Sequence, residues 1–290
     1  MLVIAFLGMG KMGRPMAYNL ASAGFRVKCW NRTSEKLGNL PSILEAHEDL
    51  QKTIAGADGV ISMLSDGSAT KKVISKLENK VLSSIKTWIE MASVLPQEAI
   101  DQSAFFQKNN ITYLDAPVSG GTVAANNRNL AIMVGGEDDA YKEAIKIFEP
   151  LGKSVLVGPC GAGQLAKLAN QAIVGITIGA VAEAVLLLER GGVNVDSVRE
   201  ALSGGFADSA ILQQHGKRMS DRNFEAGGSI KTQLKDMQNI QYTAQMFGVE
   251  LPMIDKVTDR YLALSDDPSN LEKDHSALFL ELLKRNSLID

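Results

Sequence analysis

Six residues near the N-terminus have the spacing of a phosphate-binding loop. Gly8, Met9, Gly10, Lys11, Met12 and Gly13 form the pattern G-x-G-x-x-G between an apolar run at 2–7 and a helical stretch that ends near Ala23. The first glycine permits a tight turn, the second lets a pyrophosphate approach the backbone, and the third lets helix and strand pack closely. The helix N-terminus supplies N–H donors for the phosphates. The pattern predicts dinucleotide binding, and a plain glycine-rich turn is the alternative.

The residues after a second strand, predicted at 25–30, favour NADP(H). An NAD enzyme usually has Asp or Glu at this place, which binds the ribose 2′-hydroxyl. This chain has Asn31, Arg32 and Thr33 instead. A guanidinium beside hydroxyl groups suits a 2′-phosphate, through charge-assisted hydrogen bonds. We therefore predict that NADP(H) is preferred. The alternative is a surface arginine in an enzyme that accepts NAD(H) as well.

A lysine and two amides share one face of a predicted helix in the second half of the chain. Lys167, Asn170 and Gln171 stand at i, i+3 and i+4. The stretch is otherwise apolar and holds no charged residue between Lys167 and Glu183. Such a polar face either lines a cleft or pairs with other groups. A solvated first turn of the helix is the alternative.

Three predicted strands, at 58–64, 87–91 and 111–115, have candidate ligand-binding residues at or just after their carboxyl ends. In open α/β sheets, ligands bind beyond the carboxyl ends of the strands. Met63, Leu64, Ser65 and Ser93 are therefore candidates for contact with the cofactor's adenosine or nicotinamide ribose. Ser119, Gly120 and Gly121 offer a hydroxyl and exposed backbone N–H groups, which suit a substrate carboxylate. Turn formation is the alternative for all of these residues.

The elements that would position these residues form an α/β domain followed by helices. Strands and helices alternate as far as strands at 130–134 and 154–157, with a helix at 138–148 between them. No strand is predicted after Val157. A long helix ending near Arg190, buried on most of its surface, joins helices at 195–202, 209–219, 230–247, 252–264 and 271–283. We predict a dinucleotide-binding domain at 1–160 and an all-α domain at 161–290.

Length and composition exclude several classes of protein. The chain has 290 residues and a formal net charge of -3, and it has no basic run that would indicate a nucleic-acid surface. Polar residues interrupt the long apolar helix below about 18 residues, which argues against a membrane span. Cys29 and Cys160 show no metal or disulfide spacing, and no basic region precedes the first strand. We expect a cytoplasmic protein.

For two further groups of residues we expect no part in catalysis or metal binding. His47, His215 and His275 are scattered along the sequence without metal-ligand spacing, so we expect structural or surface histidines and no metal. Lys235 and Asp236 lie inside a predicted helix, where an exposed ion pair is the usual outcome.

Together these motifs resemble the β-hydroxyacid dehydrogenase family, which includes 3-hydroxyisobutyrate dehydrogenases and several semialdehyde reductases. The resemblance covers nearly the whole chain. It rests on FLGMGKMGRPMAYNL, DAPVSGG, GAGQLAKLANQ and LKDM, in that order. The late DHSAL and the KLANQ form look most like the tartronate semialdehyde reductase branch. The family implies a Rossmann-type domain joined by a long helix to an all-α domain, and a homodimer or homotetramer.

The resemblance also implies roles for single residues. Lys167 matches the family's catalytic lysine, and Ser119, Gly120 and Gly121 match the loop that binds the substrate carboxylate. Ser93 stands where the family has a threonine at the nicotinamide ribose, and Lys235 matches a lysine near the cofactor.

Two departures from the family pattern concern the substrate. Gln171 replaces the usual asparagine and Asn170 precedes it, so either amide is a candidate for substrate contact. Gly228 stands where a phenylalanine is expected, which would open that wall of the active site.

The resulting hypothesis is an NADPH-preferring reductase of a small semialdehyde or 2-oxo acid, with Lys167 as general acid. In the reverse direction it would oxidise a 3-hydroxyacid. An imine reductase on the same scaffold and a non-catalytic dinucleotide-binding module are the alternatives.

Overall fold

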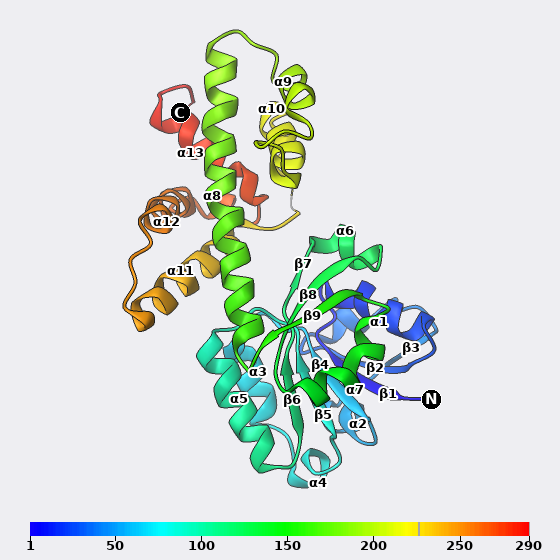
Figure 1. Cartoon of the computed structure of the whole chain (residues 1–290). Helices are drawn as coiled ribbons and strands as arrows, with labels where there is room; N and C mark the ends of the chain where they lie inside the picture. Colours follow the sequence, from blue (N-terminus) through cyan, green and yellow to red (C-terminus); the bar gives the residue numbers. More distant parts are fainter. Residues whose placement is uncertain (226, 290) are drawn as a thin grey trace. The chain divides into compact units, whose positions relative to one another are not determined.

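The computed structural model describes residues 1–225 and 227–289 (Figure 1). The chain forms two compact units, Met1–Lys167 and Leu168–Asp290. The dividing point lies within one continuous helix, a few residues beyond the predicted domain boundary.

Unit 1 is built on a single sheet that has nine strands among the described residues. They are β1 (Val3–Leu7), β2 (Arg26–Trp30), β3 (Leu44–Ala46), β4 (Gly59–Ser62), β5 (Thr87–Glu90), β6 (Thr112–Asp115), β7 (Val118–Ser119), β8 (Leu130–Gly135) and β9 (Gly152–Gly158). Their order is β3-β2-β1-β4-β5-β6-β8-β7, with β9 paired to β8. The first six strands are parallel. The order 3-2-1-4-5-6 is that of dinucleotide-binding folds, so the predicted Rossmann-type domain is confirmed.

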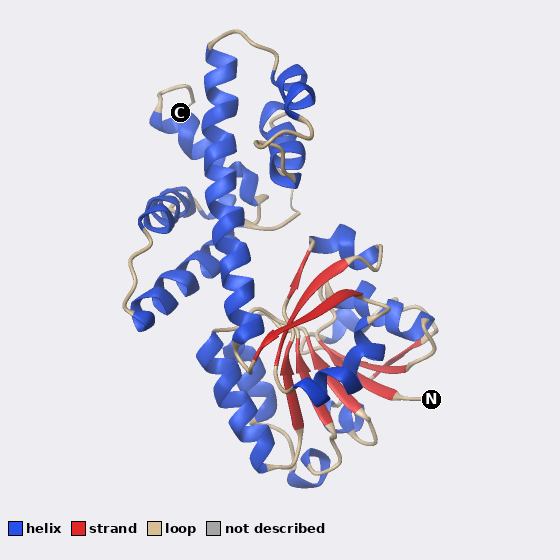
Figure 2. Ribbon diagram, in the orientation of Figure 1, coloured by secondary structure: helices blue, strands red, loops and turns tan. Residues whose placement is uncertain are grey.

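Helices cover both faces of this sheet (Figure 2). One face packs against α1 (Gly13–Ser22), α6 (Gly121–Asn126) and α7 (Asp138–Phe148). The other packs against α2 (Leu50–Ile54), α3 (Gly67–Ile74), α4 (Asn79–Leu82) and α5 (Pro96–Lys108), where Phe106 stacks on Trp88 with ring centroids 4.7 Å apart. A short 3₁₀ turn, η1 (Ser34–Leu37), follows β2. Since both faces are buried, the parallel strands read as continuous apolar runs.

The predicted long helix is α8 (Ala162–Arg190). The expectation that most of its surface is buried is wrong. Ile178 and Ala182 are fully buried in the core of unit 2, but Ile173 is 67% and Leu187 75% exposed. The expectation failed because apolar composition does not show how many sides of a helix are covered. The exposed residues fit the predicted association of copies of the chain, which stays a prediction.

By length and composition alone, α8 could also cross a membrane, since its most apolar window has a mean hydropathy of 2.0. Core helices pass the same test. The fully buried Ile178, Ala182 and Val185 face other helices of unit 2, so we interpret α8 as a core helix.

Unit 2 is helical, as predicted. Its other elements are α9 (Val195–Leu202), the π-helical turn η2 (Leu212–Gly216), α10 (Lys217–Ser220), α11 (Ile230–Phe247), α12 (Pro252–Ser265), the 3₁₀ turns η3 (Pro268–Asn270) and η4 (His275–Ala277), and α13 (Leu278–Arg285). The helix predicted at 271–283 starts only at Leu278. The preceding residues turn because the buried Asp274 carboxylate accepts hydrogen bonds from the backbone of Ser276, Gly227 and Gly228.

Candidate active site

Two glycines of the predicted phosphate loop have no room for a side chain. Gly8 has φ +109°, and a Cβ on it would lie 2.2 Å from the carbonyl oxygen of Met63. A Cβ on Gly13 would lie 1.9 Å from the carbonyl oxygen of Gly8. A Cβ on Gly10, by contrast, would meet nothing within 4 Å. The loop is therefore closed on the protein side and open at Gly10, as a bound pyrophosphate requires.

The start of α1 also suits a phosphate. Its first turn holds no acidic residue that would compete with an anion. The loop lies at the carboxyl end of β1, where the sheet order reverses between β1 and β4. These residues fit a dinucleotide, with Gly8 to Gly13 at its pyrophosphate.

Asn31 connects this loop to the residues predicted to choose the cofactor. Its Oδ1 accepts a hydrogen bond from the N–H of Met9 at 3.0 Å, and its Nδ2 donates to the carbonyl oxygen of Thr33 at 3.0 Å. Arg32 and Thr33 are exposed. Within the described part of the chain, the Arg32 guanidinium makes no hydrogen bond or ion pair, so a ligand phosphate would not have to displace a protein carboxylate.

The residues at the end of β4 divide between two roles. Met63 and Leu64 both lie against Gly8, with Leu64 Cδ2 3.2 Å from the site of a Gly8 Cβ. The Ser65 hydroxyl donates to Asp66 Oδ2 at 2.9 Å, while Asp66 Oδ1 caps α3 at the N–H of Ala69. Ser65 thus holds the carboxylate that caps α3, and its predicted contact with the cofactor stays a prediction.

The N-terminus of α8 is fastened to unit 1 by two fully buried side chains. The Asp115 carboxylate accepts the N–H groups of Gly161 and Gln164, each at 2.8 Å. The Gln164 amide donates to the carbonyl oxygen of Ala92 at 2.9 Å and accepts the N–H of Val94 at 3.0 Å. These two contacts lie on either side of Ser93. We call this arrangement the Asp115–Gln164 clamp.

Close approach of backbones makes the clamp possible. A Cβ on Gly163 would lie 2.5 Å from the carbonyl oxygen of Met133, and one on Gly135 would lie 2.4 Å from Asp115 Oδ1. Sequence analysis did not single out Gln164, Gly163 or Gly135. The signal available was the glycine-rich start of an apolar helix that carries a glutamine.

Several predicted site residues stand close to the clamp in the sequence. Ser93 lies between its two contacts, and Ser119 ends β7, four residues after Asp115. Lys167 follows Gln164 by one turn of α8. Gly120 and Gly121 have φ +123° and +64°, and both are exposed. Ser93 and the half-buried Lys167 are therefore neighbours of the clamp in sequence, whereas Ser119, Gly120 and Gly121 follow it at the end of β7.

Asn170 and Gln171 are joined to each other and to α11. Asn170 Nδ2 donates to Gln171 Oε1 at 2.9 Å, and Gln171 Nε2 donates to Asp236 Oδ2 at 2.7 Å. Lys235 Nζ lies 3.2 Å from Asp236 Oδ1, but Asp236 is buried, so the expected exposed ion pair is wrong. The hydrogen bond from the Gln171 amide on α8 compensates this buried carboxylate for part of its lost hydration.

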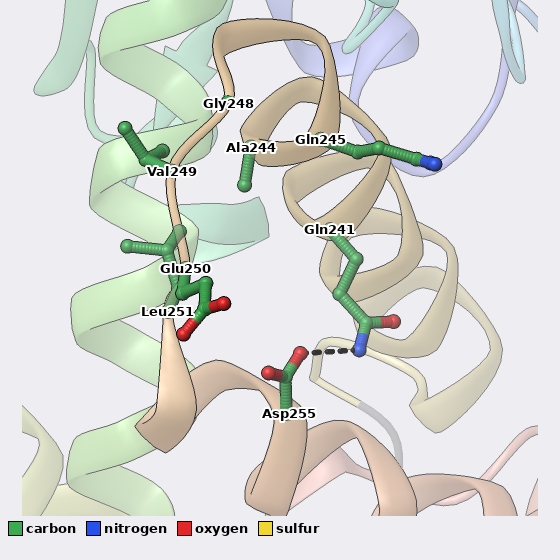
Figure 3. Close-up of a pocket in the computed structure, with 8 residues that line it drawn as sticks. All are labelled: Gln241, Ala244, Gln245, Gly248, Val249, Glu250, Leu251 and Asp255. Atoms are coloured by element: carbon green, nitrogen blue, oxygen red, sulfur yellow. Dashed lines mark hydrogen bonds between the residues drawn. The ribbon is translucent and has the colours of Figure 1, made fainter.

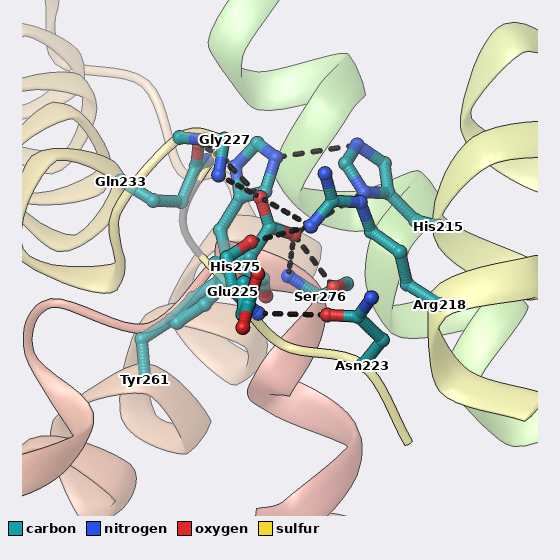
Figure 4. A network of polar contacts seen from close by, with 11 residues as sticks. His215, Arg218, Asn223, Glu225, Gly227, Gln233, Tyr261, His275 and Ser276 are labelled. Atoms are coloured by element: carbon teal, nitrogen blue, oxygen red, sulfur yellow. Dashed lines mark hydrogen bonds and ion pairs between the residues drawn. The ribbon is translucent and has the colours of Figure 1, made fainter. Parts of the chain in front are cut away.

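Two of the histidines are not scattered in space. His215 and His275 lie 60 residues apart, yet their Nε2 atoms are 3.2 Å apart (Figure 4). A Cβ on Gly228 would lie 3.4 Å from Cε1 of His275. The imidazole therefore packs beside Gly228 at an ordinary contact distance, and the expected opening of the active-site wall stays a prediction. No pattern of local spacing could have paired these residues.

A surface hollow lies where the chain turns from α11 into α12 (Figure 3). It is lined by Gln241, Ala244, Gln245, Gly248, Val249, Glu250, Leu251 and Asp255. A hydrogen bond of 2.8 Å from Gln241 Nε2 to Asp255 Oδ1 crosses it. Its lining includes none of the predicted site residues.

Comparison with known proteins shows the family of the chain. The model of the NAD-binding domain of 6-phosphogluconate dehydrogenase matches residues 3–159, and that of NADP-dependent 3-hydroxyisobutyrate dehydrogenase matches residues 161–282. The chain is 35% identical to 2-hydroxy-3-oxopropionate reductase of Escherichia coli (strain K12), over 98% of this chain and 99% of that protein.

Solved structures show the same relationship. A Mycobacterium tuberculosis 3-hydroxyisobutyrate dehydrogenase, solved with L-serine, superposes with a TM-score of 0.87 at 27% identity, over 97% of this chain and 99% of that one. An imine reductase from Pseudomonas sp. reaches a TM-score of 0.66 at 20% identity, which shows a shared fold alone. The chain belongs to the 3-hydroxyisobutyrate dehydrogenase family of NAD(P)-dependent oxidoreductases.

Proposed function

We propose that this enzyme reduces 2-hydroxy-3-oxopropionate (tartronate semialdehyde), or a close 3-oxo acid, with NADPH, and that Lys167 is its general acid. The observation that carries the proposal is the Asp115–Gln164 clamp. It holds the start of the helix of Lys167 against Asp115 at the end of β6 and against the backbone on either side of Ser93. In this proposal Lys167 is the proton donor, Ser93 is the ribose ligand, and the loop from Ser119 to Gly121 binds the substrate carboxylate.

The names of relatives support the substrate class. One acts on 2-hydroxy-3-oxopropionate, others are 3-hydroxyisobutyrate dehydrogenases, and one from Pseudomonas aeruginosa is an NAD-dependent L-serine dehydrogenase. These compounds share a carboxylate and an oxygen on C3, and they differ at C2, which carries a hydroxyl, a methyl or an amino group. The amides of Asn170 and Gln171 favour a polar group at C2, since a polar substituent can pair with them.

The chain's own residues supply binding and proton transfer. The bound nicotinamide would provide the hydride for C3. In our proposal, the Ser119 hydroxyl and the N–H groups of Gly120 and Gly121 hold the carboxylate. Lys167 donates a proton to the carbonyl oxygen as negative charge develops there. In the oxidative direction, the neutral lysine takes the proton from the hydroxyl. Asn170, one turn after Lys167, orients the C2 substituent.

NADPH oxidation tests this proposal directly. Tartronate semialdehyde, glyoxylate, succinic semialdehyde and methylmalonate semialdehyde are offered in turn, with NADPH and with NADH. We expect the highest kcat/KM for tartronate semialdehyde with NADPH. A preference for a substrate without a polar C2 group would contradict the role given to the amides. No turnover with any of the four, despite NADPH binding, would redirect attention to C=N substrates or to a binding module.

Replacing Arg32 by glutamate should reverse the cofactor preference. The carboxylate repels a 2′-phosphate and suits a 2′-hydroxyl, and a lost charge-assisted hydrogen bond is worth roughly 10- to 100-fold in affinity. We therefore expect KM for NADPH to rise by about that factor, while KM for NADH changes little. Lys80→Glu on α4 is the control, since it makes the same charge change on an exposed residue that precedes β5. An unchanged NADPH-to-NADH ratio in Arg32→Glu would refute the 2′-phosphate assignment.

A further inference from the structure

Arg14 connects the helix of the phosphate loop to the turn that follows the predicted cofactor-choosing residues. It is the second residue of α1. Its Nη2 donates to the carbonyl oxygen of Lys36 at 2.7 Å and to that of Gly38 at 2.9 Å. These partners lie 22 and 24 positions further along the chain, so no pattern of local spacing could have indicated them.

The two carbonyl groups belong to the end of η1. The last carbonyl groups of a helical turn have no N–H partner within the turn, and arginine or lysine side chains can supply one. The Gly38 N–H bonds the carbonyl oxygen of Glu35 at 3.2 Å, inside the turn. The carbonyl groups of Lys36 and Gly38 accept from Arg14 instead. The guanidinium therefore fixes the C-terminal end of η1 to α1.

Asn31 fixes the other end of the same segment. Its amide oxygen accepts the N–H of Met9 in the phosphate loop, and its amide nitrogen donates to the carbonyl oxygen of Thr33. Residues 31–38 are thus bonded to the phosphate loop at their start and to α1 at their end. The exposed Arg32 follows the first attachment directly, and the second lies a few residues beyond it.

The contacts of Arg14 leave its positive charge uncompensated. Both acceptors are neutral carbonyl groups, and the described residues show no ion pair between Arg14 and a carboxylate. Arg32 and Lys36 add two positive charges within the segment, against the single carboxylate of Glu35. A segment of this charge favours a ribose that carries a phosphate over one that carries a neutral hydroxyl.

We propose that Arg14 is a positioning residue for cofactor choice, which holds η1 against α1 and thereby keeps Arg32 and Thr33 in place for a ribose 2′-phosphate. The inference rests on the proposed function, in which the cofactor is NADPH. Both cofactors use the phosphate loop, whereas only NADPH has a group for the segment that Arg14 holds. The loss of Arg14 therefore affects NADPH far more than NADH.

Two other roles of Arg14 predict different results. If its hydrogen bonds only stabilised unit 1, their loss would weaken NADPH and NADH equally, because the two cofactors share every group except the 2′-phosphate. If the guanidinium bound the 2′-phosphate itself, its effect would not depend on Arg32. The positioning role predicts an effect that is confined to NADPH and that disappears when Arg32 is absent.

Fluorescence titration of the full-length protein with NADPH and with NADH tests the proposal without turnover. In Arg14→Ala, the end of η1 loses two hydrogen bonds from a charged donor. We expect the dissociation constant of NADPH to rise about tenfold and that of NADH to stay within about twofold. Arg14→Lys keeps the charge and a donor for these carbonyl groups, so it should recover part of the loss. An unchanged NADPH-to-NADH ratio in Arg14→Ala would overturn the proposal.

A double-mutant cycle with Arg32 tests whether Arg14 acts through the segment. Once Arg32→Ala has removed the side chain that is to be positioned, adding Arg14→Ala should weaken NADPH binding by less than about twofold. A full tenfold loss in both backgrounds would mean that Arg14 acts on the phosphate directly, and would overturn the positioning role.

Arg26→Ala is the matched control. Arg26 is an exposed arginine on β2 that donates two hydrogen bonds, at 2.6 and 3.0 Å, to the Glu45 carboxylate. Its loss removes the same charge and the same number of hydrogen bonds from unit 1, and should leave the NADPH-to-NADH ratio unchanged. An equal shift of this ratio in Arg26→Ala and Arg14→Ala would show a general effect of charge and would overturn the role of Arg14.

The outcomes separate this inference from the proposed function. If the unmodified chain binds NADPH no more tightly than NADH, the proposed cofactor preference fails and the inference fails with it. If the unmodified chain prefers NADPH and Arg14→Ala keeps that preference, only the inference fails.

Discussion

Replacing Lys167 by alanine should lower kcat for carbonyl reduction about 1000-fold and leave NADPH binding within about twofold. General acid catalysis by a positioned side chain contributes about 100- to 10,000-fold, and alanine has no proton to give. The cofactor should still bind, because its pyrophosphate is expected at the loop from Gly8 to Gly13. The close contacts that shape this loop do not include the lysine. Steady-state rates and fluorescence titration with NADPH measure the two quantities.

Lys167→Arg separates proton transfer from charge. Arginine keeps the positive charge but does not release its proton at accessible pH, so it should be nearly as inactive as alanine. Substantial activity in Lys167→Arg would mean that the charge matters more than the proton. A Lys167→Ala enzyme with normal kcat would remove the lysine from the mechanism. Lys146→Ala serves as the control, since Lys146 is an exposed lysine on α7 that is given no part in binding or in proton transfer.

The second large effect concerns Glu90, which ends β5 and is fully buried. Its Oε1 accepts the N–H of Ala92 at 2.9 Å, and its Oε2 has no well-formed hydrogen bond among the described residues. Burial raises the pKa of Glu90 to about 8, against the smaller opposing effect of hydrogen bonds from Ala92 and nearby hydroxyls. The carboxyl is therefore neutral in the folded protein at pH 7.

This pKa makes unit 1 lose stability as the pH rises. Between the unfolded pKa of 4.5 and the folded pKa of about 8, the folded chain keeps a proton that the unfolded chain has released. The free energy of unfolding then falls by about 1.4 kcal/mol per pH unit, or about 3 kcal/mol between pH 5 and pH 8. Glu90→Gln is neutral at every pH. We expect it to remove this slope and to be more stable than the unmodified chain at pH 8.

Urea unfolding at pH 5, 7 and 8 measures this difference. Tryptophan fluorescence reports on unit 1, because both tryptophans, Trp30 and Trp88, lie there. The control is Glu143→Gln on α7, which removes the same charge from an exposed residue. Curves of stability against pH that stay parallel for Glu90→Gln and the unmodified chain would show that the carboxyl is ionised when folded.

Local sequence determined the elements and the cofactor loop. Helices at 138–148, 195–202 and 230–247 have the predicted bounds, because their ends are marked by nearby residues. Ser229 caps the N-terminus of α11 at the N–H of Thr232, and Gly248 ends it with a φ of +67°. The same holds for Gly8 and Gly13, whose steric role depends on a strand, a turn and a helix that follow one another directly.

Tertiary structure decided what depends on residues far apart in the chain. The pairing of His215 with His275, the burial of Asp236 beneath Gln171 and the late start of α13 at Leu278 each depend on partners from other elements. The exposed side of α8 also depends on tertiary structure, because composition shows that a helix is apolar but not which of its sides the neighbouring helices cover. Periodicity and spacing report on a few turns of chain. The contacts of Asp236 with Gln171 and of Asp274 with His215 likewise join residues that lie far apart in the sequence and that only the folded chain brings together.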